Sequence, residues 1–124
     1  MGKSNFIFDF LKSKGIKTYY PANKFGECKE EYVVIKGAGS SQYNTLSTKV
    51  DIYDIMCYVP QNKFSILEDY VENIEKYMQE LEPTILPTYS KTAPFYDDSL
   101  KAHMVSVQYI NYRKIERGVL NGSN

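Results

Sequence analysis

The stretch TKVDIYDIMCYVPQNKFSILEDYVENIEKYMQELE, residues 48–82, contains the two patterns that decide the fold. Its first part, Thr48 to Val59, is rich in β-branched and aromatic residues, which are typical of a strand. Pro60 ends this strand, and Asn62 is a candidate cap for a helix. From there apolar residues recur at alternating spacings of three and four; they are Phe64, Leu67, Val71, Ile74, Met78 and Leu81. The stretch therefore predicts a long strand and then an amphipathic helix that packs on a sheet.

The predicted strand has one apolar face that a charged residue interrupts. A spacing of two places Val50, Ile52, Met56 and Tyr58 on the same side. Asp54 breaks that face, either as a bulge or buried carboxylate with a partner, or as an exposed kink. We favour the exposed kink.

The residues before this stretch predict a helix, two short strands and a loop. Ser4 is the expected N-cap of a helix that Gly15 ends, with Phe6, Ile7, Phe10 and Leu11 as its apolar residues. Ile16 to Tyr20 and Tyr32 to Lys36 are predicted strands. The Gly- and Ser-rich segment from Gly37 to Ser47 is predicted to be a flexible loop.

The residues after the stretch predict an edge strand, a loop and a last strand. Thr84 to Tyr89 is the expected edge strand, and Ser90 to Lys101 a long polar loop. Ala102 to Arg113 is the last strand, with Val105, Val107 and Tyr109 on one face. The fold class is therefore α+β, a small, mainly antiparallel sheet of four to five strands packed by two helices. We expect a single domain over residues 1–114 and a flexible tail over 115–124.

Charge and composition narrow the classes of partner. Fifteen basic residues balance fifteen acidic ones, so no net field attracts nucleic acid or an anionic membrane. No apolar run reaches membrane-spanning length, and no signal peptide begins the chain, so we expect synthesis in the cytoplasm. The twelve tyrosines suit either a surface that a partner covers or the decoration of a small sheet.

The patterns that could indicate a cofactor or a metal site are incomplete. Gly37-Ala38-Gly39 resembles the start of a dinucleotide fingerprint, but Gln42 occupies the third glycine position and no helix follows. Asp97 and Asp98 form an acidic pair without the further oxygens of a calcium site, which favours a solvated loop. We expect no cofactor and no metal.

One arrangement of residues is compatible with nucleophilic catalysis. If the last strand pairs with the third, His103, Cys57 and Asp54 could act as base, nucleophile and orienting group. An ordinary surface or interface histidine is the favoured alternative, and Cys28 and Cys57 lack the spacing of a zinc site. We therefore expect no catalytic residues and no enzyme activity.

Two oppositely charged segments are candidate contact surfaces. Lys63 to Glu82 contains six acidic residues and two lysines, a charge of about −4. Near the C-terminus lies a basic and aromatic cluster of Tyr109, Tyr112, Arg113, Lys114 and Arg117. Such a cluster could stack on nucleic acid, but the zero net charge favours contact with another subunit.

Three short stretches and a helix carry a family resemblance, and they are Phe10 to Tyr20 (FLKSKGIKTYY), Glu31 to Ile35 (EYVVI), Lys49 to Tyr53 (KVDIY) and the helix from Phe64 to Leu81. Their order resembles that of the tail terminator proteins of tailed bacteriophages. The resemblance extends over roughly Asn5 to Lys114, nearly the whole chain. It implies the same α+β fold and a structural protein of the virion.

The resemblance also implies a function and its partners. A tail terminator closes into a homo-oligomeric ring, typically a hexamer, on the last ring of the tail tube, where it stops polymerisation and presents a docking surface to the head connector. The implied partners are the tail tube protein, the head–tail connector protein and the tail sheath. The implied location is the head-proximal end of the virion tail, after assembly in the host cytoplasm. The alternatives are another head–tail joining or tail completion protein, or a small stand-alone protein-binding domain.

A ring requires head-to-tail contacts between different faces of identical subunits. Under this hypothesis the segments Gly37 to Ser47 and Ser90 to Lys101 project toward the tube or the connector, and the two charged segments meet between subunits. The candidate interface residues are Gly37, Gly39, Tyr43, Glu68, Glu72, Asp97, Asp98, Arg113, Lys114 and Arg117.

Overall fold

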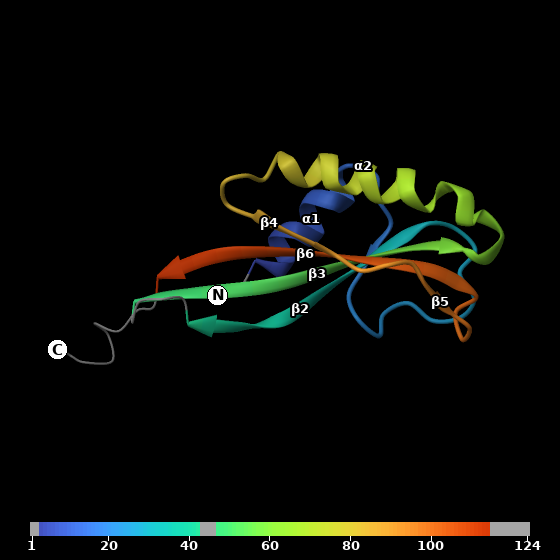
Figure 1. The fold of residues 1–124 in the computed structure, drawn as a ribbon, viewed down its shortest axis with the longest axis horizontal. Helices are drawn as coiled ribbons and strands as arrows, with labels where there is room; N and C mark the ends of the chain where they lie inside the picture. The colour runs from blue at the N-terminus through green and yellow to red at the C-terminus, as the bar shows by residue number, and fades with distance from the viewer. Residues whose placement is uncertain (1–2, 43–46, 115–124) are drawn as a thin grey trace.

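Two helices lie against a six-stranded sheet in the computed structural model, which describes residues 3–42 and 47–114 (Figure 1). The elements in chain order are α1 (Ser4–Ser13), β1 (Thr18–Tyr19), β2 (Tyr32–Gln42), β3 (Thr48–Pro60), the 3₁₀ helix η1 (Gln61–Ile66), α2 (Leu67–Gln79), β4 (Leu86–Lys91), β5 (Phe95–Asp97) and β6 (Ala102–Lys114). The α+β class and the mainly antiparallel sheet are confirmed. The sheet has one strand more than the expected four to five.

The sheet is built around the pairing of its two longest strands. β3 and β6 pair along their whole length without a shift in register, from Thr48 opposite Lys114 to Pro60 opposite Ala102. The strand order is β1-β2-β3-β6-β4, and β5 also pairs with β6. Among the strands of the described residues, only β1 is parallel to its neighbour. β4 lies at an edge, as its proline predicts, because proline cannot donate to a second strand.

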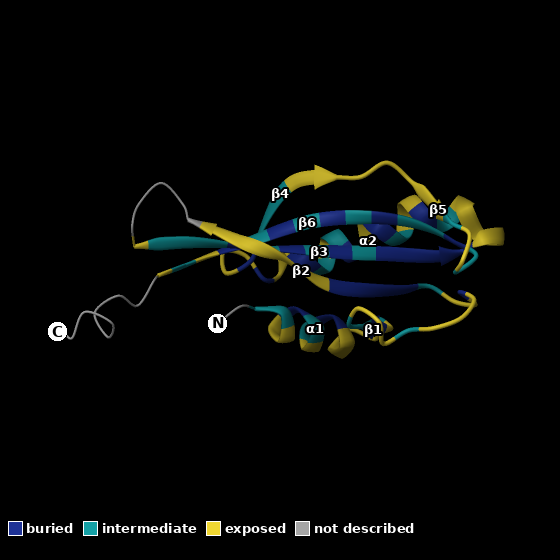
Figure 2. Cartoon of the chain, turned by 90° about the horizontal axis from the view of Figure 1, so that it is seen from below, coloured by how far each residue is buried: buried dark blue, intermediate teal, exposed yellow. Residues whose placement is uncertain are grey.

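The main core lies between α2 and the face of the sheet that carries odd-numbered residues. It joins the helix stripe to both central strands and includes Ile55, Cys57, Val59, Val71, Ile74, Met78, Val105, Val107 and Tyr109. The predicted helix stripe is thus confirmed from Leu67 to Leu81, and so is the predicted face of the last strand. The alternation of dark blue and teal along β3 and β6 shows this two-sided pattern, with α2 behind the strands (Figure 2).

The four residues predicted to share a face of β3 do share one. Val50, Ile52, Met56 and Tyr58 lie on the side opposite α2, where Met56 and Tyr58 belong to a second, smaller cluster. The sequence left open which face of β3 meets the helix, because both faces are apolar and a spacing of two cannot rank them. Asp54 lies on the same face in unbroken register with Gln108, so it forms neither the bulge nor the kink considered from the sequence.

Both helices start differently from the prediction. α2 begins at Leu67, after η1, in which Lys63 has non-helical torsion angles (φ −123°, ψ 32°). Asn62 therefore does not cap α2, and Phe64 lies outside the buried stripe with 52% of its surface exposed. At α1, Lys3 and not Ser4 occupies the N-cap position. Gly15 ends that helix as predicted, with a φ of +83° that favours glycine.

Two segments predicted as loops contain strands. β2 continues through Gly37 to Gln42, paired with β3, with a register shift between Gly37 and Ser40 where Gly39 has a φ of +100°. The segment Ser90 to Lys101 contains β5 and the end of β4. Residues 43–46 and the predicted tail 115–124 lie outside the described residues.

Candidate assembly surfaces

The far ends of β2, β3 and β6 form an arm that reaches past both helices (Figure 1). We call residues 36–42, 48–53 and 110–114 the three-stranded arm. Its centre is Asp51, which is 3% exposed. The Nε of Arg113 lies 2.5 Å from Oδ2 of Asp51, and the hydroxyl of Ser40 donates to Oδ1 at 2.6 Å. One carboxylate thus joins side chains from all three strands.

The environment of Asp51 keeps its carboxylate charged. Burial by itself would raise its pKa, but hydrogen bonds from Arg113 and Ser40 and the positive charge of Arg113 outweigh burial and hold the pKa below its usual value. Arg113 is therefore engaged within the subunit and is not a free surface cation. Its role in an intersubunit contact stays a prediction.

A second buried contact ties the arm to the start of α1. The hydroxyl of Tyr53 accepts a hydrogen bond from the backbone N–H of Lys3 at 2.6 Å and donates one to Oδ1 of Asn111. Tyr53 and Asn111 are both almost fully buried, and burial raises the pKa of Tyr53. The Lys3 contact fixes the arm to the start of α1, whereas the contacts of Asn111 and Asp51 hold the strands of the arm together.

The acidic face of α2 keeps several charges that no ion pair uses. Glu75 lies 3.4 Å from Lys91, and Glu80 lies 3.0 Å from Lys14. Glu68 and Glu72 are exposed, and neither has an ion pair within the described part of the chain. Both remain candidates for contact with a basic surface.

The basic end of the arm is smaller than the sequence suggested. Lys114 is exposed at the end of β6, whereas Tyr109 is buried in the main core and cannot stack on a ligand. Tyr43 and Arg117 lie outside the described residues. Gly37 and Gly39 are part of β2 in the arm, at and beside its bulge.

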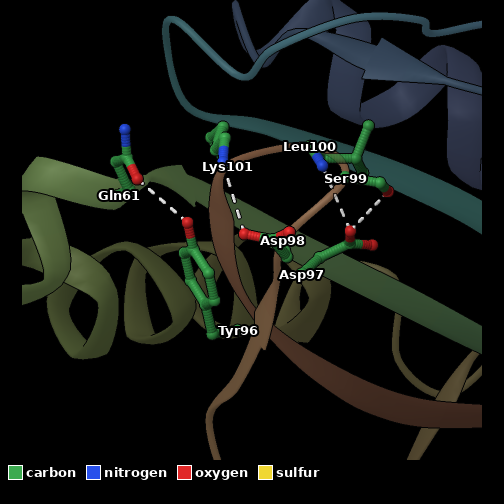
Figure 3. A network of polar contacts seen from close by, with 7 residues as sticks. All are labelled: Gln61, Tyr96, Asp97, Asp98, Ser99, Leu100 and Lys101. Atoms are coloured by element: carbon green, nitrogen blue, oxygen red, sulfur yellow. Dashed lines mark hydrogen bonds and ion pairs between the residues drawn. The ribbon is translucent and has the colours of Figure 1, made fainter.

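Asp97 and Asp98 shape the turn between β5 and β6 (Figure 3). Oδ1 of Asp97 accepts hydrogen bonds from the hydroxyl of Ser99 at 2.7 Å and the N–H of Leu100 at 3.1 Å. Asp98 lies 3.3 Å from Nζ of Lys101. Both acidic side chains therefore make contacts within the turn itself.

An aromatic cluster beside this turn was not predicted from the sequence. The ring of His103 lies 4.8 Å from that of Phe64 and 5.2 Å from that of Tyr96, measured between centroids. Gln61 contacts two of the three, since its side-chain oxygen accepts from the Tyr96 hydroxyl at 2.9 Å and its carbonyl lies 3.1 Å from Nε2 of His103. The signal was absent from the sequence because three separate elements supply these side chains.

The considered group of Cys57, His103 and Asp54 does not form a reactive arrangement. Cys57 is fully buried in the main core, and burial raises the pKa of its thiol. Asp54 lies on the opposite face of β3. His103 contacts Phe64 and Tyr96 instead.

An apolar groove opens next to the aromatic cluster. It has a volume of about 420 Å³ and lies between the start of α2 and the segment that joins β4 to β5. Leu67, Val71 and Val105, all buried, form its floor. Phe64 and Pro94 stand at its mouth. We call this the α2 groove.

Comparison with known proteins supports the fold alone. No protein-family model and no curated protein matches the sequence. A solved structure known only by a sequence identifier matches with a TM-score of 0.53 and 12% sequence identity, over 87% of this chain and 86% of that one. Among the described residues, no helix is both long and apolar enough to cross a membrane.

Proposed function

We propose that this chain is a tail terminator protein of a tailed bacteriophage, which closes into a homo-oligomeric ring on the tail tube, stops its polymerisation and forms the docking surface for the head connector. The proposed partners are the tail tube protein, the head–tail connector protein and the tail sheath. The proposed location is the head-proximal end of the virion tail. We propose a structural role without catalytic activity.

The observation that carries the proposal is the three-stranded arm. The hydroxyl of Tyr53 ties it to the start of α1 through the N–H of Lys3, and the contacts of Asp51 hold its three strands together. A fixed projection supports assembly because it loses little conformational entropy when a neighbouring subunit or tube subunit covers it. A monomer with no partner has no evident use for such an arm.

The distribution of charge also supports contacts between unlike surfaces. Glu68 and Glu72 lie on α2, whereas Lys114 lies at the end of the arm. Opposite charges on different surfaces of one subunit favour the head-to-tail contacts that a ring needs. Exposed ion pairs stabilise weakly, so apolar contacts must supply most of the affinity.

One observation favours the alternative of a small stand-alone protein-binding domain. The two open sheet edges, which are β4 and the part of β2 beyond the short β1, have features that hinder pairing with another chain. β2 has the bulge at Gly39, and β4 contains Pro87 and a register shift at Tyr89, whose φ is +64°. This alternative predicts a monomer. Another head–tail joining or tail completion protein would form a ring that binds the connector but does not limit tube length.

The test combines light scattering with electron microscopy of tail tubes. The purified chain is measured over a series of concentrations and then added to polymerising tail tube protein. We expect rings at tube ends in negative stain, and tubes that stop lengthening. A chain that stays monomeric and leaves tube ends bare contradicts the proposal and favours the stand-alone domain.

A charge exchange tests the role of the acidic face. Glu72→Lys should reduce capping of tubes, and Asp9→Lys is the matched control because it makes the same change of charge on an exposed residue of α1. Adding Lys114→Glu to Glu72→Lys should restore capping if the two surfaces meet. Equal effects of Glu72→Lys and Asp9→Lys would contradict this part of the proposal.

A further inference from the structure

Phe25 is the most exposed phenylalanine among the described residues. It lies in the connection between β1 and β2, with 78% of its surface exposed. Gly26 follows with a φ of +84°, which favours glycine and turns the chain sharply. Burial of this side chain against a partner would remove its apolar surface from water, which favours association.

The connection that presents Phe25 is anchored to the body of the protein. The N–H of Cys28 donates to the carbonyl of Leu100 at 2.7 Å, and the N–H of Asn23 donates to the carbonyl of Tyr20 at 3.1 Å. Cys28 is buried in the second cluster together with Tyr32. Phe25 therefore projects from a held turn, and burying it in a partner orders little additional chain.

The α2 groove has the shape and chemistry to receive an aromatic side chain. Its volume of about 420 Å³ lies within the range of about 300–1,000 Å³ typical of ligand pockets. Its floor is apolar, and Ser65, Glu68, Lys91 and Thr92 form its polar rim. An apolar floor with a polar rim is the usual surrounding of an aromatic residue that dominates an interface.

The projecting residue and the groove lie on opposite sides of the subunit. Phe25 precedes β2 and follows β1, the edge strand on one side. The groove borders the segment between β4 and β5, on the other side of β6. Figure 1 shows the β1–β2 connection on the side of the sheet away from α2. Phe25 thus cannot fill the groove of its own chain.

We propose that Phe25 of one copy inserts into the α2 groove of a second copy. The charges agree with this pairing, because Lys91 on the rim of the groove is paired with Glu75, which leaves Glu68 as the rim charge that can meet the Lys24 next to Phe25. A projecting residue and a groove at different sites make a heterologous contact, which repeats from subunit to subunit. This contact adds a specific interface between subunits to the proposed function. It rests on that proposal only for the closure of the repeating contact into a ring.

Cysteine cross-linking tests the contact in the full chain. Ser65 lies exposed on the rim and Asn23 lies exposed two residues before Phe25, so a chain with both Asn23→Cys and Ser65→Cys, which keeps Phe25, should form a ladder of disulfide-linked oligomers under mild oxidation. The natural Cys28 and Cys57 are buried and provide little background. A mixture of the two single variants should give linked dimers and no longer products. Absence of a ladder, at any concentration and with tube ends present, overturns the contact.

Phe25→Ala provides a second measurement. Loss of the buried ring should weaken each contact by about tenfold to a hundredfold, read as a shift of assembly to higher concentration in light scattering. Phe6→Ala is the matched control, because Phe6 is also exposed but lies on α1. Circular dichroism checks that both variants fold. Equal assembly of both variants overturns the contact.

The outcomes separate this contact from the proposed function. Rings that cap tubes but give no cross-links overturn the Phe25 contact and leave the tail terminator proposal intact. Cross-linked oligomers that leave tube ends bare support the contact and contradict the proposed function.

Discussion

Tyr53→Phe removes one buried hydroxyl that holds the three-stranded arm. In the native protein this hydroxyl accepts from the N–H of Lys3 and donates to Oδ1 of Asn111. Each such hydrogen bond contributes about 0.5–1.5 kcal/mol, and a buried acceptor left without a donor costs about 1–3 kcal/mol. Asn111 is 2% exposed, so water cannot replace the lost donor, whereas Lys3 is only half-buried. We expect a loss of about 2 kcal/mol in the free energy of unfolding.

The loss is measured by urea unfolding followed by circular dichroism. Tyr58→Phe is the matched control, because it removes a hydroxyl from the same strand outside this network. That control should change the free energy of unfolding by less than about 0.5 kcal/mol, as is usual away from buried networks. Tyr53→Phe should also lower assembly on tubes. Equal stability of the two variants would refute the assignment of Tyr53 as an anchor of the arm.

Three further predictions concern the core, acid stability and the thiols. Ile74→Ala, at a fully buried position of α2, should lower the free energy of unfolding by about 2–5 kcal/mol in urea denaturation. The pKa of Asp51 is lowered by folding, so its carboxylate stabilises the protein above the ordinary aspartate pKa, and this stabilisation should disappear as pH falls through the folded-state pKa. Asp51→Asn should therefore show a shallower loss of stability in acid titration. Burial raises the pKa of Cys28 and Cys57, so a disulfide reagent at pH 8 should label both only after unfolding in urea.

Each of these has a clear contrary result. A small effect of Ile74→Ala would mean that α2 does not cover the core as described. If Asp51→Asn leaves the loss of stability at acid pH unchanged, a group other than Asp51 causes that loss. Rapid labelling of native Cys57 would show that its environment is open to solvent.

Local patterns in the sequence were sufficient to predict the elements in which buried residues recur at a single regular spacing. Val71, Ile74 and Met78 recur at helical spacing, and Val105 and Val107 alternate along the last strand. These residues pack together as their patterns predicted. The α+β class followed from the order of such elements.

Other elements could not be predicted because their structure depends on a neighbour. Gly37 to Gln42 has the composition of a loop, and it forms a strand because β3 supplies hydrogen-bond partners along it. Tertiary pairing outweighs propensity at such a position. The core-facing side of β3 was undecided for a related reason, since only the position of α2 distinguishes its two apolar faces.

Some candidate surfaces could be predicted from the sequence, and others depend on the tertiary structure. The acidic face of α2 was visible in the sequence, because charges on one helix follow from spacing alone. The ion pair of Asp51 with Arg113 joins residues 62 positions apart, and the α2 groove is lined from α2, η1, β6 and the segment after β4. The exposure of Phe25 likewise follows from how its connection packs. Composition and period therefore specified the helices, the long strands and the fold class, whereas register and packing between distant segments decided which side chains are buried, paired or presented to a partner.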